Sequence, residues 1–247
     1  MKSILVAVLM LFSMSSNVSA QLVERTEVDA SDIQANLTRL YPQVPWGTPE
    51  PSDIANMYIV PILGSSEMIY VSSDGRHLLT GRVFRIDGAS PVDVVEEREM
   101  PRRAAALAAV DLEDAIVYTP EEKKARIYVF TDISCGFCRQ MHNRMDEMLE
   151  AGIEVVYLAY PRDTRAASRT AYLEMTGIWC ADDRAYALDR AFQGADFTPE
   201  TCNQLVREQY ELGVSLGVNS TPHIFFEDGT KIPGAQPTEA LVQALGI

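Results

Sequence analysis

Apolar and polar positions in the first third of the chain predict one short helix followed by a strand hairpin. Apolar residues recur at helical spacing over residues 32–40, and Ser31 precedes them as a candidate cap. Apolar runs at 67–71 and 78–86 then flank the turn residues Asp74-Gly75. Because glycine tolerates the positive φ that such turns require, this pattern predicts a hairpin. The region is small and mostly strand, so we expect its core to be thin.

An Ala/Leu-rich stretch follows and predicts a helix between two regions. It opens at Pro101, a residue suited to a first helical turn, and runs to Ala115. Such a helix either packs on a domain or holds two domains apart, and the sequence is compatible with both. The predicted organisation of the exported chain is therefore an N-terminal domain at 21–98, a helical linker at 99–118 and a C-terminal domain at 119–247.

The C-terminal region changes to a strand–helix–strand pattern. A strand at 126–131, a helix at 139–151 and a strand at 153–159 imply a crossover connection and hence a parallel strand pair. The fold class is thus α/β or α+β. The remaining predicted elements are a long helical stretch at 164–216, a hairpin of 224–226 and 231–232, and a helix at 238–245 capped by Thr238.

The first twenty residues have the pattern of an export signal. Lys2 precedes an apolar run at 4–12, and the segment closes with the small residues Val18-Ser19-Ala20. We expect cleavage after Ala20 and localisation in the periplasm; an uncleaved membrane anchor is the less favoured alternative. Export matters for the chemistry because disulfides form and persist outside the cytoplasm.

Composition narrows the possible functions. The chain has 247 residues, of which 47% are hydrophobic and 23% charged, as in ordinary globular proteins. A formal net charge of −14 argues against binding to nucleic acid or an anionic membrane, because both are polyanions. Four cysteines are too few for a disulfide-framed scaffold of this length, so their spacing carries the information.

The chemistry is predicted at Cys135-Gly136-Phe137-Cys138. Two cysteines at this spacing, between a strand and a helix, can close a disulfide, while the first helical turn stabilises a thiolate. Cys135 is predicted to be the more exposed, nucleophilic thiol, and Cys138 the resolving thiol. A zinc site would need more ligands nearby, and haem attachment would need histidine where Arg139 stands. An inert short-loop disulfide is the remaining alternative and would add little stability.

Two further features bear on this site. Thr221-Pro222 precedes a predicted strand, where proline is unexpected unless its peptide bond is cis or it begins the strand. Beside a redox disulfide, such a proline lies where an extended substrate can pair with the backbone. Cys180 and Cys202 are expected to form a structural disulfide shielded by Trp179, with a second redox pair as the alternative.

These residues resemble the bacterial periplasmic thiol:disulfide isomerases of the DsbC/DsbG type, and the glycine after Cys135 resembles the DsbC branch. The resemblance covers nearly all of the chain after the export signal. The stretches that carry it are 130–138, 157–162, 178–181, 212–218, 220–222 and 228–234, together with 73–77 and 89–94 in the N-terminal region.

The resemblance implies a thioredoxin-like C-terminal domain with a helical insertion, preceded by a small, mostly β dimerisation domain. It implies a homodimer that holds misfolded exported proteins in an apolar cleft, with both isomerase and chaperone activity, and a membrane-embedded reductase as electron donor. We expect no cofactor and no metal. By position, Cys135 attacks, Cys138 resolves, and Cys180 with Cys202 forms the structural bridge. The residues implied to contact substrate are Gly136, Phe137, Thr221 and Pro222.

One position departs from ordinary thioredoxins. Val129 stands where they carry a buried acid, so another group or water must serve Cys138. Asp132 is a candidate for this role, but the favoured interpretation is a solvated loop carboxylate, and His142 is interpreted as a helix-surface residue. Two rival functions use the same sequence: an oxidant that donates its disulfide to substrates, and a holdase that needs no sulfur chemistry.

Overall fold

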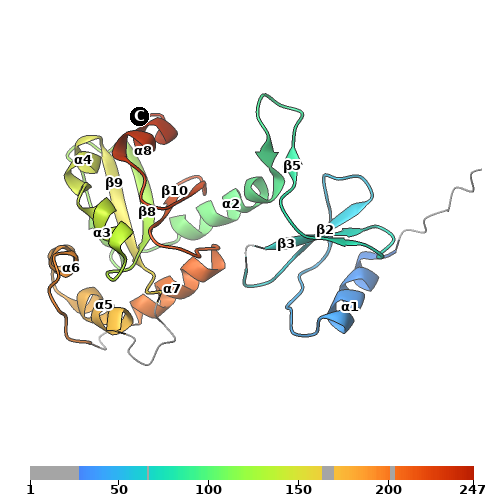
Figure 1. Ribbon diagram of the computed structural model, residues 1–247, viewed down its shortest axis with the longest axis horizontal. Helices are drawn as coiled ribbons and strands as arrows, with labels where there is room; N and C mark the ends of the chain where they lie inside the picture. The colour runs from blue at the N-terminus through green and yellow to red at the C-terminus, as the bar shows by residue number, and fades with distance from the viewer. Residues whose placement is uncertain (1–27, 66, 163–169, 201–203) are drawn as a thin grey trace, which may run out of the picture.

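A computed structural model of the chain describes residues 28–65, 67–162, 170–200 and 204–247. Helix α2 joins an N-terminal domain to a larger C-terminal domain (Figure 1). The predicted signal peptide and its cleavage position after Ala20 lie outside the described residues. In the part of the chain that is described, none of the helices combines the length and apolarity needed to span a membrane.

The N-terminal domain is an antiparallel sheet of order β1-β2-β3-β4 with helix α1 packed on it. Ile33 and Leu37 of α1 bury their side chains against Val60, Ile69 and Val71 of the sheet, so the core is as thin as predicted. The elements are α1 (Ala30–Leu40), β1 (Glu50–Pro51), β2 (Met57–Pro61), β3 (Met68–Ser72) and β4 (Leu78–Leu79).

The start of α1 corrects a prediction. The carboxylate of Asp29 accepts a hydrogen bond from the Ser31 amide at 2.8 Å, so Asp29 is the cap and Ser31 is already inside the helix. An aspartate carboxylate can satisfy an unpaired first-turn amide as well as a serine hydroxyl can.

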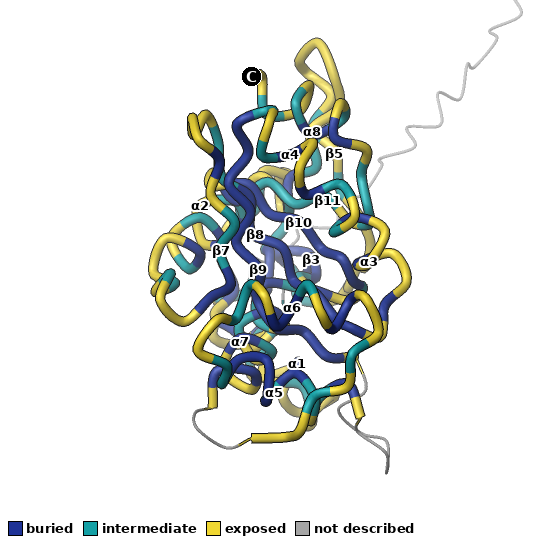
Figure 2. Tube along the Cα trace, turned by 90° about the vertical axis from the view of Figure 1, so that its left-hand side faces the viewer, coloured by how far each residue is buried: buried dark blue, intermediate teal, exposed yellow. Residues whose placement is uncertain are grey.

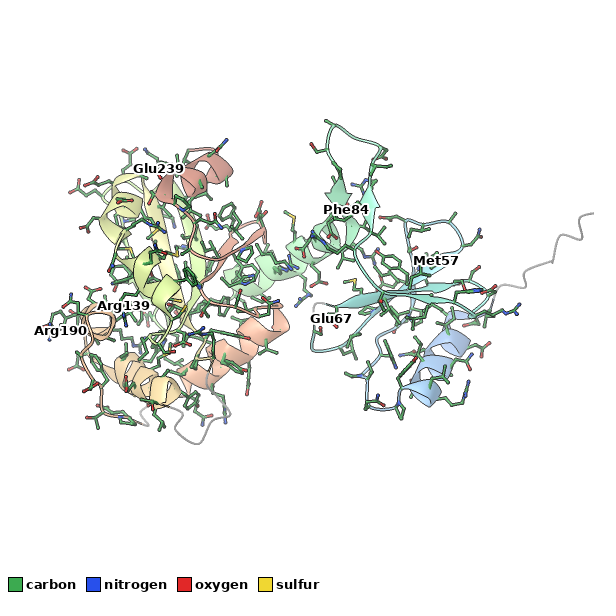
Figure 3. The ribbon with its side chains drawn as sticks, in the orientation of Figure 1. Met57, Glu67, Phe84, Arg139, Arg190 and Glu239 are labelled. Carbon is green, nitrogen blue, oxygen red and sulfur yellow. The ribbon has the colours of Figure 1, made fainter. Side chains whose placement is uncertain are left out.

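The hairpin of the N-terminal domain is confirmed, but its second strand is shorter than predicted. β3 pairs with β4 across the turn, where Gly75 has a φ of 67°. Gly81, at a φ of 126°, redirects the chain, and β5 (Phe84–Arg85) pairs with β6 (Val92–Asp93) instead. Phe84 lies on this separate strand pair, near the beginning of α2 (Figure 3).

Helix α2 (Val94–Ala108) begins earlier than the helix predicted from Pro101. Its cap is Asp93, whose carboxylate accepts from the amides of Val95 and Glu96 at 3.0 and 3.2 Å. Pro101 therefore lies inside the helix, where it removes one backbone donor. Two ion pairs of Glu96 help to offset the loss of that donor. Glu96 binds Arg103 of the same helix at 2.7 Å and Lys231 of the C-terminal domain at 2.6 Å.

The C-terminal domain is built on a five-stranded sheet of order β11-β10-β8-β9-β7. β8 and β9 are parallel and run in register from Ala125 opposite Ile153 to Thr131 opposite Ala159, which confirms the predicted crossover. β10 pairs antiparallel with β8, and β7 antiparallel with β9. The strands are β7 (Ile116–Tyr118), β8 (Ala125–Thr131), β9 (Ile153–Ala159), β10 (His223–Phe226) and β11 (Lys231–Pro233).

Helices cover both faces of this sheet. The single helix predicted at 139–151 is two helices: it starts directly after Cys135 and is interrupted at Asn143-Arg144. The last helix is capped by Pro237, so the prediction of Thr238 as its cap is wrong by one residue. The helices are α3 (Gly136–His142), α4 (Met145–Glu150), α5 (Thr170–Cys180), α6 (Arg184–Phe192), α7 (Leu205–Ser215) and α8 (Thr238–Leu245).

The core follows the two-residue period of the strands. Ile127 and Val129 of β8 point into the larger cluster, with α3 to α6 and α8, while Tyr128 and Phe130 point to the other face. There they meet Leu107 of α2 and the residues that follow α7. The three central strands β10, β8 and β9 are buried along most of their length (Figure 2), so they form a firm base for the segments at their ends.

Candidate active site at the start of helix α3

The two cysteines of the predicted redox motif lie where β8 gives way to α3. Cys135 is the N-cap residue of α3, and its carbonyl oxygen accepts from the Arg139 amide at 3.1 Å. Cys138 lies in the first turn of the same helix. This position puts both sulfurs near unpaired first-turn amides and the positive end of the helix dipole, where a thiolate is stabilised.

The loop before β10 closes over Cys135. The Thr221-Pro222 peptide bond is cis, as the sequence suggested, and the Cys135 Sγ lies 3.2 Å from the Thr221 carbonyl oxygen. The pairing of His223 with Phe130 sets this distance, because it aligns the start of β10 with the end of β8. The segments carrying the two motifs, 86 residues apart, therefore form one site.

The prediction that Cys135 is exposed is wrong in this conformation. Its exposed fraction is 2%, because the loop of Thr221 and Pro222 covers the sulfur. The neighbouring residues of the motif face outwards instead: the side chain of Phe137 is 65% exposed, and the space around Gly136 is open. Gly136 and Phe137 are therefore the accessible residues of the motif, and the Cys135 sulfur lies just beneath the surface.

Electrostatics distinguish the two thiols. Burial opposes the ionisation of Cys135, but the Thr221 side chain, the neighbouring groups of Cys138 and the charge of Arg162 lower its pKa below the usual range. Burial dominates at Cys138 and raises its pKa to about 12. A thiolate therefore forms more readily at Cys135 than at Cys138 near neutral pH.

Asp132 is a buried ion-pair partner, and its interpretation as a solvated loop carboxylate is wrong. Its exposed fraction is 0%. One carboxylate oxygen accepts from the amide and hydroxyl of Ser134 at 2.8 and 2.7 Å. The other accepts from the Arg162 amide at 3.1 Å and from its guanidinium at 2.8 Å. These bonds shape the turn before Cys135 and hold Arg162 near the nucleophile.

The same correction applies to His142, which is not a surface residue. Its side chain is 10% exposed and lies 3.0 Å from the Asp189 carboxylate, which also accepts from the Tyr118 hydroxyl at 2.6 Å. The ring packs against Phe192 at 4.7 Å between centroids. Burial lowers the pKa of His142, although Asp189 opposes the shift. The contact between His142 and Asp189 could not be predicted from the sequence, because Asp189 lies on α6, far along the chain from His142.

Cys180 is disulfide-bonded, at the end of α5. Its predicted partner, Cys202, lies outside the described residues. Trp179 is fully buried beside Cys180, in keeping with the predicted shielding role. Within the described ranges, no three His, Cys, Asp or Glu side chains gather as a metal-binding group.

Comparison with known proteins gives the family. Residues 24–96 match the family described as "Disulfide bond isomerase protein N-terminal domain", and residues 112–246 match a "Thioredoxin-like domain". The chain is 39% identical over 184 residues to the thiol:disulfide interchange protein DsbC of Dickeya dadantii, covering 74% of each chain. The chain belongs to the DsbC family.

Other members of the DsbC family match over similar lengths. The DsbC of Escherichia coli (strain K12) is 35% identical over 196 residues, or 79% of each chain. The DsbC of Haemophilus influenzae is 32% identical over 178 residues, or 72% of this chain and 75% of that protein. The predicted resemblance, the thioredoxin-like fold and the assignment as a thiol:disulfide oxidoreductase are thereby confirmed.

Proposed function

We propose that the chain isomerises or reduces incorrect disulfides in exported proteins, with Cys135 as the nucleophile. The Cys135 thiolate attacks one sulfur of a substrate disulfide, forms a mixed disulfide and releases the other substrate sulfur as a thiolate. A substrate thiol then displaces Cys135 to give a new pairing. The observation that carries this proposal is the lowered pKa of Cys135 at the N-cap of α3.

Cys138 gives the reaction a second outcome. If no substrate thiol displaces Cys135 from the mixed disulfide, the Cys138 sulfur attacks the Cys135 sulfur. The substrate then leaves as a reduced thiol, and Cys135 and Cys138 become a disulfide. Continued turnover then requires an electron donor, which we propose is a membrane-embedded thiol reductase. The raised pKa of Cys138 delays this attack and favours isomerisation over reduction.

The substrate is proposed to lie across Gly136, Phe137, Thr221 and Pro222. The exposed Phe137 ring offers an apolar contact, and the open space at Gly136 admits a main chain close to the sulfur. The backbone ahead of Pro222 is placed to pair with an extended segment in the way that an added strand does. Such contacts are largely independent of side-chain identity, which suits a protein that acts on many clients.

We further propose a periplasmic homodimer that pairs through the N-terminal domain and holds misfolded clients, adding chaperone activity to the sulfur chemistry. The proposed contact is strand β4, which ends the sheet and carries Leu78 and Leu79, exposed by 42% and 50%. An edge strand with apolar side chains is a template for pairing with another chain. The thin core of the domain also favours stabilisation by a second copy.

The test is reactivation of a protein whose disulfides have been scrambled, in a glutathione buffer. The wild type is expected to restore activity, Cys135→Ser to restore none, and Cys138→Ser to retain isomerisation but trap mixed disulfides. Equal recovery by Cys135→Ser would exclude the proposed nucleophile. Reactivation only from a fully reduced substrate would identify an oxidant, and suppression of aggregation with no reactivation would identify a holdase.

A further inference from the structure

Arg162 lies beside the active site, on the side away from the loop of Thr221 and Pro222. The strand order β10-β8-β9 brings the start of β10 and the ends of β8 and β9 to one edge of the sheet. The chain runs from β8 into Cys135 and from β9 into Arg162. The Arg162 Nη2 lies 3.5 Å from the Oγ of Ser134, the residue before Cys135. Cys135 is therefore flanked by the proline loop on one side and by Arg162 on the other.

A buried carboxylate fixes the direction of this guanidinium. One oxygen of Asp132, a residue with an exposed fraction of 0%, accepts from the Arg162 amide at 3.1 Å and from its Nε at 2.8 Å. The Arg162 side chain is nevertheless 48% exposed, and its Nη1 has no acceptor among the residues that the structure describes. One edge of the guanidinium is thus anchored, and the other is directed to solvent in a preorganised position.

The exposed charges around the redox motif are positive. In the segments that form the active site, 132–139, 160–162 and 219–223, the acidic and basic side chains that reach solvent are Arg139 and Arg162. The chain as a whole has a formal net charge of −14, so overall composition does not explain this positive rim. The free edge of a guanidinium carries N–H donors that match the two oxygens of a carboxylate.

We propose that Arg162 is a specificity residue of the active site, which binds a carboxylate next to the substrate disulfide. The inference rests on the proposed function, because attack by Cys135 is what brings that carboxylate to Arg162. The carboxylate belongs to an acidic residue beside the reacting cysteine of a client, or to a small carboxylated disulfide. Asp132 acts as a positioning residue, since it holds the guanidinium that makes the contact.

The test measures how a charge beside a disulfide changes the rate of attack by Cys135. All proteins carry Cys138→Ser, so no second active-site thiol reacts. The small probes are anionic dithiobis(nitrobenzoate) and neutral dithiodipyridine. In each, the Cys135 sulfur bonds to one probe sulfur and the other leaves as an absorbing product. Two peptides with blocked ends and the same disulfide, flanked by either Glu or Gln, represent clients.

Arg162→Met is expected to lower two rate ratios about threefold, anionic over neutral probe and Glu over Gln peptide, as for an exposed charge pair. A changed pKa of Cys135 slows all probes alike, so the ratios report recognition alone. Arg139→Met, which removes the other exposed arginine, should leave both ratios unchanged. Arg162→Lys keeps the ion pair with Asp132 but no second free edge, and should lower the ratios about twofold even if Arg162→Met does not fold.

Unchanged ratios in the Arg162 variants, or an equal change in Arg139→Met, would overturn the assignment. A change confined to the small probes would identify small carboxylated disulfides as the ligands, and a change in the peptide ratio would identify acidic clients. Slow reaction of the parent protein with every probe would instead contradict the proposed function itself.

Discussion

The two sulfurs lie one helical turn apart, yet their surroundings shift their pKa values in opposite directions. Cys135 has Thr221, the groups of Cys138 and the charge of Arg162 to favour its thiolate. Cys138 is dominated by burial. Pairs of titrating groups pushed apart in this way mark a division of roles, here between attack and resolution.

Arg162 is the contribution to this division that is easiest to remove. We expect Arg162→Met to raise the pKa of Cys135 and to slow its alkylation at pH 7 by about threefold, because the lost charge stabilises only the thiolate. Iodoacetamide kinetics measure this rate. Arg139→Met is the matched control, since Arg139 is an exposed arginine on α3 (Figure 3). Equal rates for the two variants would exclude a specific effect of Arg162.

His223, next to the cis proline, makes folding stability depend on pH. Burial, with Lys231 and Arg103 nearby, lowers its pKa to about 4. The unfolded chain binds this proton below about pH 6.5, while the folded chain binds it only near pH 4, so the stability is present above that window and lost as the pH falls through it. The loss reaches about 3 kcal/mol.

His223→Phe is expected to remove this part of the pH dependence. Urea unfolding of both proteins at a series of pH values from 7 to 4 measures the difference, and the carboxylates that also titrate there cancel between the two proteins. Parallel stability curves for the wild type and His223→Phe would show that His223 is not the group responsible.

The sequence predicted the role of a residue where that role follows from its spacing to neighbouring motif residues. Cys135, Cys138 and Pro222 could be predicted because two cysteines at that separation, with a proline before a strand, have few other uses. Asp132 and His142 could not, because their roles depend on burial and on partners distant along the chain, Arg162 and Asp189. Spacing carries no information about such partners.

Among the elements, the boundaries of α2 and of the β4–β5 region were the least predictable. Pro101 indicated a helix start, but the carboxylate of Asp93 caps the helix earlier, and Glu96 forms ion pairs with Arg103 in the same helix and with Lys231 of β11. The break at Gly81 depends on β5 finding β6 as its partner. The β8–β9 pair was predicted well because its alternating apolar residues are buried on both faces.

The contact between α2 and the β10–β11 turn can be tested with one glycine. Gly229 has a φ of 86°, and a Cβ there would overlap the backbone carbonyl oxygen of Met100 in α2. We expect Gly229→Ala to destabilise the fold by at least about 2 kcal/mol more than Gly194→Ala. Gly194 has a similar φ of 93° but open space around it, so its substitution costs only the backbone strain.

Urea or thermal unfolding of the two alanine variants checks this expectation. Equal destabilisation would mean that α2 does not press on the turn after β10. A larger loss in Gly229→Ala would show that α2 packs directly against this turn in the folded protein.

At the scale of the whole molecule, the N-terminal domain is proposed to join two copies. We expect Leu79→Lys to weaken the dimer and to lower isomerase activity, because the charge lies on the free edge of β4. Sedimentation or light scattering measures the mass. Leu63→Lys, at a 58% exposed leucine outside the strands, should remain dimeric. A monomeric wild type, or a Leu79→Lys variant as dimeric as the wild type, would contradict this contact.

The proposed sulfur chemistry depends most directly on the acidity of Cys135. The rate of alkylation of Cys135 in the Cys138→Ser variant, measured from pH 4 to 10, follows its thiolate fraction without interference from the second thiol. We expect a midpoint below that of free cysteine measured under the same conditions. At pH values below the midpoint of free cysteine, Cys135 should react faster than the free thiol. A midpoint at or above that of free cysteine would contradict the proposed sulfur chemistry.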